Sequence, residues 1–168
     1  QRAWLITSVL CAAGIAGERP FRRLTYREAL ESYGSDRPDL RYELHLVDLS
    51  TASAGSGFEP FEKALAGGGT ARGLRVPGGA AFSRKKLDEL TEAARAHGAG
   101  GLLWIKRSAG EVSSPAKKNL PEAVFSRLLT AAEVADGDLL LIVADRPKAV
   151  FASLAALRSA VARELKLV

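Results

Sequence analysis

The sequence predicts an α+β domain, a two-layer fold in which a mixed or antiparallel sheet carries its helices on one face, preceded by two short helices. Three observations support this class. Segments typical of strands and of helices follow one another in an irregular order, without the strict alternation of a parallel sheet. Hydrophobic residues make up 47% of the 168 residues, which is enough to bury a core. Residues 139–144 form an uninterrupted apolar run, which is typical of a central strand.

Residues 1–41 are predicted to form a helical connector. A first helix is expected from about Ala3 to Ala13, because apolar residues recur there at helical spacing, and this run is too short to span a bilayer. A second helix is expected after Thr25, whose hydroxyl can form a capping box with Glu28. Gly34 should end it, since glycine adopts the left-handed conformation without a steric cost.

Residues 42–168 are predicted to form the α+β domain itself. Its first part should contain a weak strand between Arg41 and Ser50 and then a loop as far as Gly57. Phe58–Lys63 and Ala71–Val76 are predicted to be two strands of a hairpin with a glycine-rich tip. That tip resembles a phosphate-binding loop, but no Gly-Lys-Ser/Thr follows it and no helix is expected to begin there, so a flexible turn is predicted.

The second part of this domain alternates helices with strands. Ser83 is expected to cap a helix from Arg84 to about His97, which has one apolar stripe. The remaining elements are expected as a strand at residues 102–105 with a short return at 110–112, a helix from Pro121, the strand at residues 139–144, and a helix from Ala149 to about Leu165.

Few side chains suggest chemistry. The lone cysteine, Cys11, excludes an internal disulfide and indicates a reducing compartment. His45 and His97 are the only histidines, and neither has a second ligand at metal spacing, so no metal site is predicted. Aspartates close to arginines or in turns are predicted to form local ion pairs and turn contacts: Asp36 and Asp39 beside Arg37 and Arg41, and Asp136 and Asp138 around a turn glycine.

The charge distribution is compatible with an anionic partner. The net charge is +5, and beyond residue 48 there are 17 basic and 12 acidic residues. Two clusters are predicted as RNA contacts: Arg84, Lys85 and Lys86 in the first turn of a helix, where the dipole disfavours cations, and Lys117 and Lys118 in an exposed loop. The alternative for both clusters is an ordinary solvated surface.

The order of several motifs points to a family. They are ERPFRRLTYREALESYGSDRPDLR at residues 18–41, LRVPGG at 74–79, SRK at 83–85, GLLWIK at 101–106 and GDLLLIVAD at 137–145. In this order they resemble the exit from the catalytic domain of bacterial or organellar-type aspartyl-tRNA synthetase into its inserted, GAD-type domain. The first block is the most specific, and the others gain weight from their order.

This resemblance implies a sheet with helices on one side, near the acceptor arm of tRNA, in an enzyme that joins aspartate to tRNA using ATP. The family's ATP-binding motifs fall before residue 1 and after residue 168, so no catalytic residue and no cofactor is carried over, and the chain is predicted to be inactive alone. The expected partners are tRNA or another RNA and a protein partner or the missing catalytic domain, with no membrane and no DNA. The expected location is intracellular, in the bacterial cytoplasm or the mitochondrial or plastid matrix.

Two alternatives stay open. The chain could be a stand-alone, catalytically dead descendant of that domain, acting as a structural or RNA-associated subunit of an organellar complex. An unrelated small enzyme is the third hypothesis, but the sequence shows no acid–base pair and no activated nucleophile for it.

Overall fold

The computed structural model describes residues 23–168, so the predicted helix at Ala3–Ala13 and Cys11 lie outside the described residues. The body contains a five-stranded sheet in the order β1-β2-β5-β3-β4, with every neighbouring pair antiparallel. Its strands are β1 (Leu46–Asp48), β2 (Thr70–Val76), β3 (Leu103–Ser108), β4 (Glu111–Ser113) and β5 (Leu139–Asp145). The α+β class and the antiparallel pairing predicted from the sequence are confirmed.

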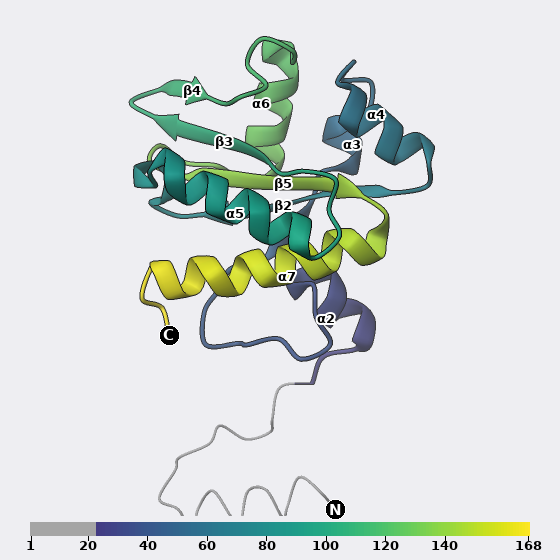
Figure 1. The fold of residues 1–168 in the computed structure, drawn as a ribbon, viewed down its shortest axis with the longest axis vertical. Helices are drawn as coiled ribbons and strands as arrows, with labels where there is room; N and C mark the ends of the chain where they lie inside the picture. The colour runs from purple at the N-terminus through teal and green to yellow at the C-terminus, as the bar shows by residue number, and fades with distance from the viewer. Residues whose placement is uncertain (1–22) are drawn as a thin grey trace, which may run out of the picture.

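Helices pack against both faces of this sheet (Figure 1). They are α2 (Tyr26–Tyr33), α3 (Ser50–Ser53), α4 (Glu59–Ala66), α5 (Arg84–Ala96), α6 (Glu122–Ala131) and α7 (Pro147–Glu164), with a 3-10 turn at Gly79–Ala81. Two predicted caps are confirmed. Thr25 and Glu28 form the capping box of α2, and Ser83 accepts a hydrogen bond from the Lys86 N–H at the start of α5.

Strand β5 lies at the centre and divides the interior into two cores. Because successive side chains of a strand point to opposite faces, Leu139, Leu141 and Val143 contact the core beneath α5 and α7. Leu140 and Ile142 belong to the core that α4 and α6 cover. The prediction that all helices lie on one face is therefore corrected: an apolar run without alternation indicates a strand that is buried on both sides.

Helix α4, which covers the sheet face that carries Leu140 and Ile142, comes from a segment whose secondary structure was predicted wrongly. Phe58–Lys63 is not a strand: Phe58 directly precedes α4, and residues 59–63 belong to that helix. Pro60 lies in its first turn with Glu59 and Glu62, and Lys63 lies in its last turn, an arrangement that suits the helix dipole. The predicted loop after Ser50 likewise contains the short helix α3. A short apolar run of this length does not separate helix from strand by periodicity.

The glycine-rich segment after α4 is consequently a link from helix to strand, not the tip of a hairpin. The Gly69 N–H donates to the carbonyl of Ala64 at 2.8 Å, which turns the chain sharply from α4 into β2. A methyl group on Gly69 would lie 2.5 Å from the carbonyl oxygen of Asp145, so the backbone of β5 passes too close for any side chain here.

The segment that leads into the sheet, α2 and residues 35–44, packs along α7 (Figure 1). The division of the chain at residue 41 into connector and domain stays a prediction. In the described part, residues 23–168, no helix is long and apolar enough to cross a membrane.

Candidate functional site

The first predicted RNA-contact cluster lies at the start of α5. Arg84 and Lys85 are exposed to solvent. The Lys86 ammonium forms ion pairs with Glu164 of α7 at 2.6 Å and with Glu89 at 3.5 Å. Glu164 thereby raises the pKa of Lys86 above its ordinary value. Lys86 thus ties the start of α5 to the end of α7, while the RNA-contact role of the cluster stays a prediction.

The second cluster, Lys117 and Lys118, is exposed in the turn between β4 and α6. Ala116 and Leu120 on either side of it are buried in the core beneath α6, which anchors the turn. Leu87, next to the first cluster, belongs to the other core. The structure therefore does not bring the two basic clusters together, because they lie over opposite faces of the sheet.

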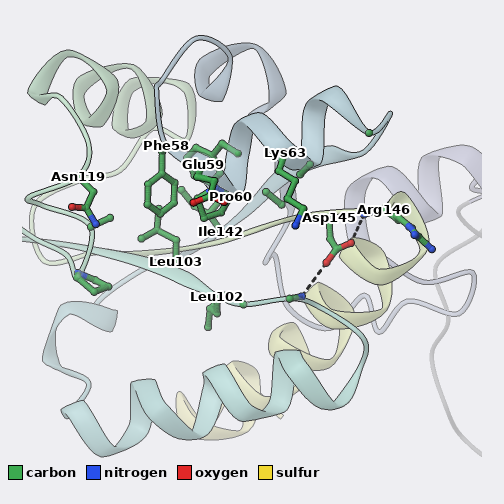
Figure 2. A pocket seen from close by; sticks show the side chains of 18 residues that line it. Phe58, Glu59, Pro60, Lys63, Leu102, Leu103, Asn119, Ile142, Asp145 and Arg146 are labelled. Atoms are coloured by element: carbon green, nitrogen blue, oxygen red, sulfur yellow. Dashed lines mark hydrogen bonds between the residues drawn. The ribbon is translucent and has the colours of Figure 1, made fainter.

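A pocket of about 920 Å³ opens beside the turn that carries Lys117 and Lys118, and Asn119 of that turn lines it (Figure 2). Its apolar floor consists of Leu103, Ile142 and Ala144 from β3 and β5. Residues 58–64 of α4 and its preceding turn form one wall, and Pro115, Ala116 and Asn119 form the opposite one. The pocket exists because α4 and α6 cover neighbouring parts of the same sheet face and leave the start of β3 open between them.

One end of this pocket carries charged side chains (Figure 2). Lys63 of α4 and Arg146, which follows β5, are exposed there, and Glu59 and Asp145 also line the pocket. Asp145 is engaged by the backbone, because its carboxylate accepts the Gly100 N–H at 2.9 Å and the Arg146 N–H at 2.7 Å. Cations therefore predominate among the charged groups left for a ligand.

Lys63 and Arg146 line one end of the pocket, and Lys117 and Lys118 lie in the turn whose Pro115, Ala116 and Asn119 line the other. These four basic residues are called the rim cations. The two lysines of the turn were predicted from the sequence as a basic loop. Lys63 and Arg146 were missed, because the segment of Lys63 was predicted to be a strand and Arg146 reaches this place only through the fold. No local signal in the sequence relates these positions to one another.

Among the described residues, His45 and Asp138 have structural contacts. Within residues 23–168 there is no group of three or more His, Cys, Asp and Glu side chains that could hold a metal ion. His45 is exposed, and its ring centre lies 5.0 Å from that of Tyr33 in a tilted contact. Asp138 has a larger structural role than the predicted turn contact. Its buried carboxylate accepts hydrogen bonds from Arg75 Nε at 2.7 Å and from the N–H groups of Ala135 and Gly78.

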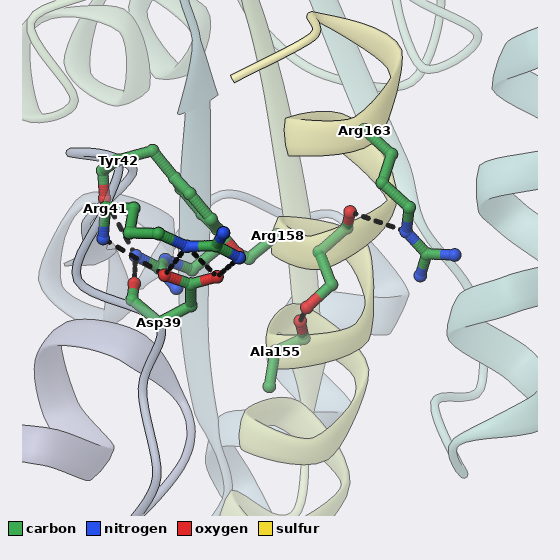
Figure 3. A network of polar contacts seen from close by, with 7 residues as sticks. Asp39, Arg41, Tyr42, Ala155, Arg158 and Arg163 are labelled. Atoms are coloured by element: carbon green, nitrogen blue, oxygen red, sulfur yellow. Dashed lines mark hydrogen bonds and ion pairs between the residues drawn. The ribbon is translucent and has the colours of Figure 1, made fainter. Parts of the chain in front are cut away.

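A buried arginine of α7 holds the segment before β1 in place (Figure 3). Arg158 is 3% exposed, and its guanidinium donates to the carbonyl oxygens of Asp39 at 2.6 Å, Tyr42 at 2.9 Å and Leu44 at 2.7 Å. It also lies 4.1 Å from the ring centre of Tyr42 and 4.9 Å from that of Tyr33. Burial lowers the pKa of Arg158 from its ordinary value.

A second arginine, Arg72 of β2, holds the same segment from the sheet. It donates to the carbonyl oxygen of Glu31 in the last turn of α2 at 3.1 Å and to the carboxylate of Asp48 at 3.2 Å. Its guanidinium lies over the ring of Phe151 of α7 at 5.1 Å. Together the two arginines fix α2 and residues 35–44 to the body.

The predicted ion pair between Asp39 and Arg41 is confirmed, with 2.6 Å between Arg41 Nη2 and Asp39 Oδ2. Asp36 is exposed and makes no ion pair within the described residues. The hydrogen bonds from Arg41 lower the pKa of the Asp39 carboxyl from 3.8 to about 2. Since the folded-state pKa is the lower one, the contribution of this pair to stability is complete above pH 3.8 and is lost as the pH falls through about 2.

We therefore expect an NMR titration of the side-chain carboxyl carbon of Asp39 to give a midpoint near 2. The variant Arg41→Gln should move this midpoint back towards 3.8, because it removes the charged donor. An Asp39 midpoint near 3.8 in the unaltered chain would contradict the ion pair.

Comparisons with known proteins agree with the fold. The family model described as GAD domain matches residues 61–154. The aspartate–tRNA(Asp/Asn) ligase of Caldanaerobacter subterraneus subsp. tengcongensis is 49% identical over 149 residues, which cover 89% of this chain and 25% of that protein. The corresponding protein of Thermoanaerobacter sp. is 46% identical over 92% of this chain and 26% of its own length. The aspartate–tRNA ligase of Clostridium kluyveri is 42% identical over 86% of this chain and 25% of its own length.

The chain belongs to the GAD domain family, since the family model covers more than half of it. It spans about a quarter of the length of the curated relatives named above.

Proposed function

We propose that this chain is the non-catalytic inserted domain of a bacterial-type aspartate–tRNA ligase, whose complete form attaches aspartate to tRNA using ATP. The observation that carries the proposal is the 49% identity with a quarter of an aspartate–tRNA(Asp/Asn) ligase. A ligase of this kind works where proteins are made, so we place the chain inside the cell, in the bacterial cytoplasm or the mitochondrial or plastid matrix.

A domain exchange tests this role. The matching quarter of the Caldanaerobacter subterraneus ligase is replaced by this chain, and charging of tRNA with aspartate is measured. We expect the chimera to charge tRNA at a rate of the same order as the parent, and the isolated chain to form no product. A matched control carries a short Gly-Ser linker in place of the domain. Charging by the isolated chain would overturn the non-catalytic role, and a chimera no more active than the linker control would overturn the family function.

We further propose that RNA, tRNA above all, is a partner of the domain, with the rest of the ligase as its protein partner. The support is the placement of exposed lysines and arginines at the pocket and at the start of α5. The native mass separates this proposal from the stand-alone subunit of an organellar complex: a native polypeptide near 17.8 kDa would favour the stand-alone subunit.

Salt dependence tests the RNA contacts. Each phosphate contact contributes about 0.7–0.9 to the slope of log K against log salt concentration. The double variant Lys117→Ala/Lys118→Ala should therefore reduce that slope for tRNA by about 1–2. Arg27→Ala/Arg163→Ala removes the same charge at exposed positions elsewhere and should leave the slope within error. Equal slopes for all three proteins would contradict a contact at Lys117 and Lys118, and the same measurement on Arg84→Ala/Lys85→Ala tests the other cluster.

A further inference from the structure

We propose that the pocket between α4 and the turn at residues 114–120 receives one unpaired nucleotide of an RNA strand whose backbone follows the rim cations. This inference deepens the proposed RNA association and rests on it. It assigns the ligand to a particular cavity and predicts that single-stranded RNA is preferred over duplex.

The size and lining of the pocket suit a nucleotide. Its volume of about 920 Å³ is within the usual range for small-molecule sites and leaves room for a base with its sugar. The floor of Leu103, Ile142 and Ala144 is apolar, as a site for the flat face of a base requires. The concave shape also matters, because a base within a stacked duplex does not protrude far enough to enter a pocket.

Phe58 provides an aromatic surface inside this pocket. Its side chain points into the cavity towards Leu103 (Figure 2). The ring is only partly buried, and an edge-to-face contact with Phe61 at 5.1 Å and 80° holds it in place. An aromatic ring held in this way can stack on any of the four bases, since each base has a π face.

Polar groups around Phe58 are available to a ligand. Within residues 23–168, the side chains of Glu59 and Asn119 have no hydrogen-bond or ion-pair partner, although both line the pocket. An amide donates and accepts, and a carboxylate accepts, so the pair matches the mixed donors and acceptors of a base edge and a ribose hydroxyl. The two groups favour a nucleoside over a purely apolar ligand.

The charges favour an RNA strand over a free nucleoside. The side chains of Lys63 and Arg146 also lack partners within the described residues, and they lie at the opposite end of the pocket from the turn that carries Lys117 and Lys118. Cations at one end of the pocket and in the turn beside the other end match the phosphates on either side of an inserted nucleotide, and such groups contact the backbone without regard to sequence. Asp145 competes little with these phosphates for the side chains of Lys63 and Arg146, because its carboxylate accepts hydrogen bonds from backbone N–H groups.

The experiment uses the full 168-residue chain and fluorescence anisotropy with a labelled single-stranded RNA octamer of mixed sequence. The competing probes are the same octamer annealed to its complement, AMP, CMP and inorganic phosphate. We expect the single strand to bind roughly tenfold or more tightly than the duplex, and the mononucleotides to compete only weakly, because they lack the flanking phosphates.

Two variants locate the binding site. Phe58→Leu keeps an apolar side chain but removes the stacking surface, and it should weaken single-strand binding by roughly 5- to 100-fold. Phe82→Leu is the matched control, because Phe82 is also a partly buried aromatic residue but packs in the other core, and its affinity should be unchanged. The surface variant Lys63→Ala/Arg146→Ala should weaken binding and reduce its salt dependence without affecting the fold.

Several outcomes would overturn the pocket assignment. They are equal affinity of Phe58→Leu and the unaltered chain, equal affinity for single strand and duplex, or inorganic phosphate competing as well as the octamer, which would indicate a simple anion site. If Phe58→Leu lowers the melting temperature, the affinity of Lys63→Ala/Arg146→Ala for the single strand is the deciding measurement. An affinity equal to that of the unaltered chain would then overturn the pocket assignment. RNA binding that depends on Arg84 and Lys85 alone would overturn the pocket while leaving the proposed RNA association intact. A chimera that does not charge tRNA would contradict only the proposed role in the ligase, and not the pocket assignment.

Discussion

Replacing Arg158 by methionine is expected to lower the free energy of unfolding by roughly 2–4 kcal/mol. The residue is 3% exposed, and its guanidinium donates to the backbone carbonyls of Asp39, Tyr42 and Leu44 at once. Methionine fills much of the aliphatic volume but donates no hydrogen bond, so the variant leaves these acceptors without their donor. It also removes the cation from between the rings of Tyr33 and Tyr42.

Denaturation in urea measures this loss, and Arg163→Met is its matched control on the same helix (Figure 3). Arg163 is exposed, and within residues 23–168 its side chain donates only to the carbonyl of Ser159 one turn earlier, so its loss should cost less than about 0.5 kcal/mol. Arg158→Lys should lie between the two, because an ammonium keeps the charge but not the planar fork of donors. A value for Arg158→Met equal to that of Arg163→Met would contradict the proposed anchoring of residues 39–44.

The second large effect is expected for Gly34→Ala, with a loss of roughly 2–4 kcal/mol. Gly34 ends α2 with a φ of 75°, a conformation that costs an L-residue about 1–2 kcal/mol. In addition, a methyl group there would lie 2.6 Å from the carbonyl oxygen of Phe151 and 3.2 Å from the backbone nitrogen of Ala155. Neither α2 nor the backbone of α7 can move aside without breaking the packing between them.

Gly55→Ala provides the control for backbone strain. Gly55 has a similar φ of 63°, but a methyl group on it would meet nothing within 4 Å. The difference between the two variants in urea denaturation therefore isolates the contact between α2 and α7, which we expect to exceed about 1 kcal/mol. Equal losses for the two variants would show that Gly34 is required only for its conformation.

Much of the secondary structure could be predicted because local interactions determine it. The capping box of Thr25 and Glu28 and the Ser83 cap depend on groups three residues apart, so their sequence patterns suffice. Phe58–Lys63 was predicted wrongly because six residues offer too few positions to distinguish a period of 3.6 from a period of two. Its helix is stabilised by packing on the sheet through Phe61, which no local pattern contains.

The candidate site could be predicted only in part. Lys117 and Lys118 are adjacent in the sequence, so their charge is visible there as a cluster. Lys63 and Arg146 come from different elements and reach the same pocket because α4 packs on β5. Lys86 shows the converse, because it belongs to a basic cluster in the sequence but is paired with Glu164 in the structure.

The sequence by itself determined the α+β class, most helix and strand positions and the likeness to the inserted domain of aspartyl-tRNA synthetase. Those features depend on hydrophobic patterns, caps and motif order, all of which act over short distances along the chain. Only the tertiary structure decided that helices cover both sheet faces, that a pocket forms between α4 and the turn at residues 114–120, and that Arg158 holds residues 39–44. These features join groups that are far apart in the sequence, and their hydrogen bonds and apolar contacts exist only once the chain is packed.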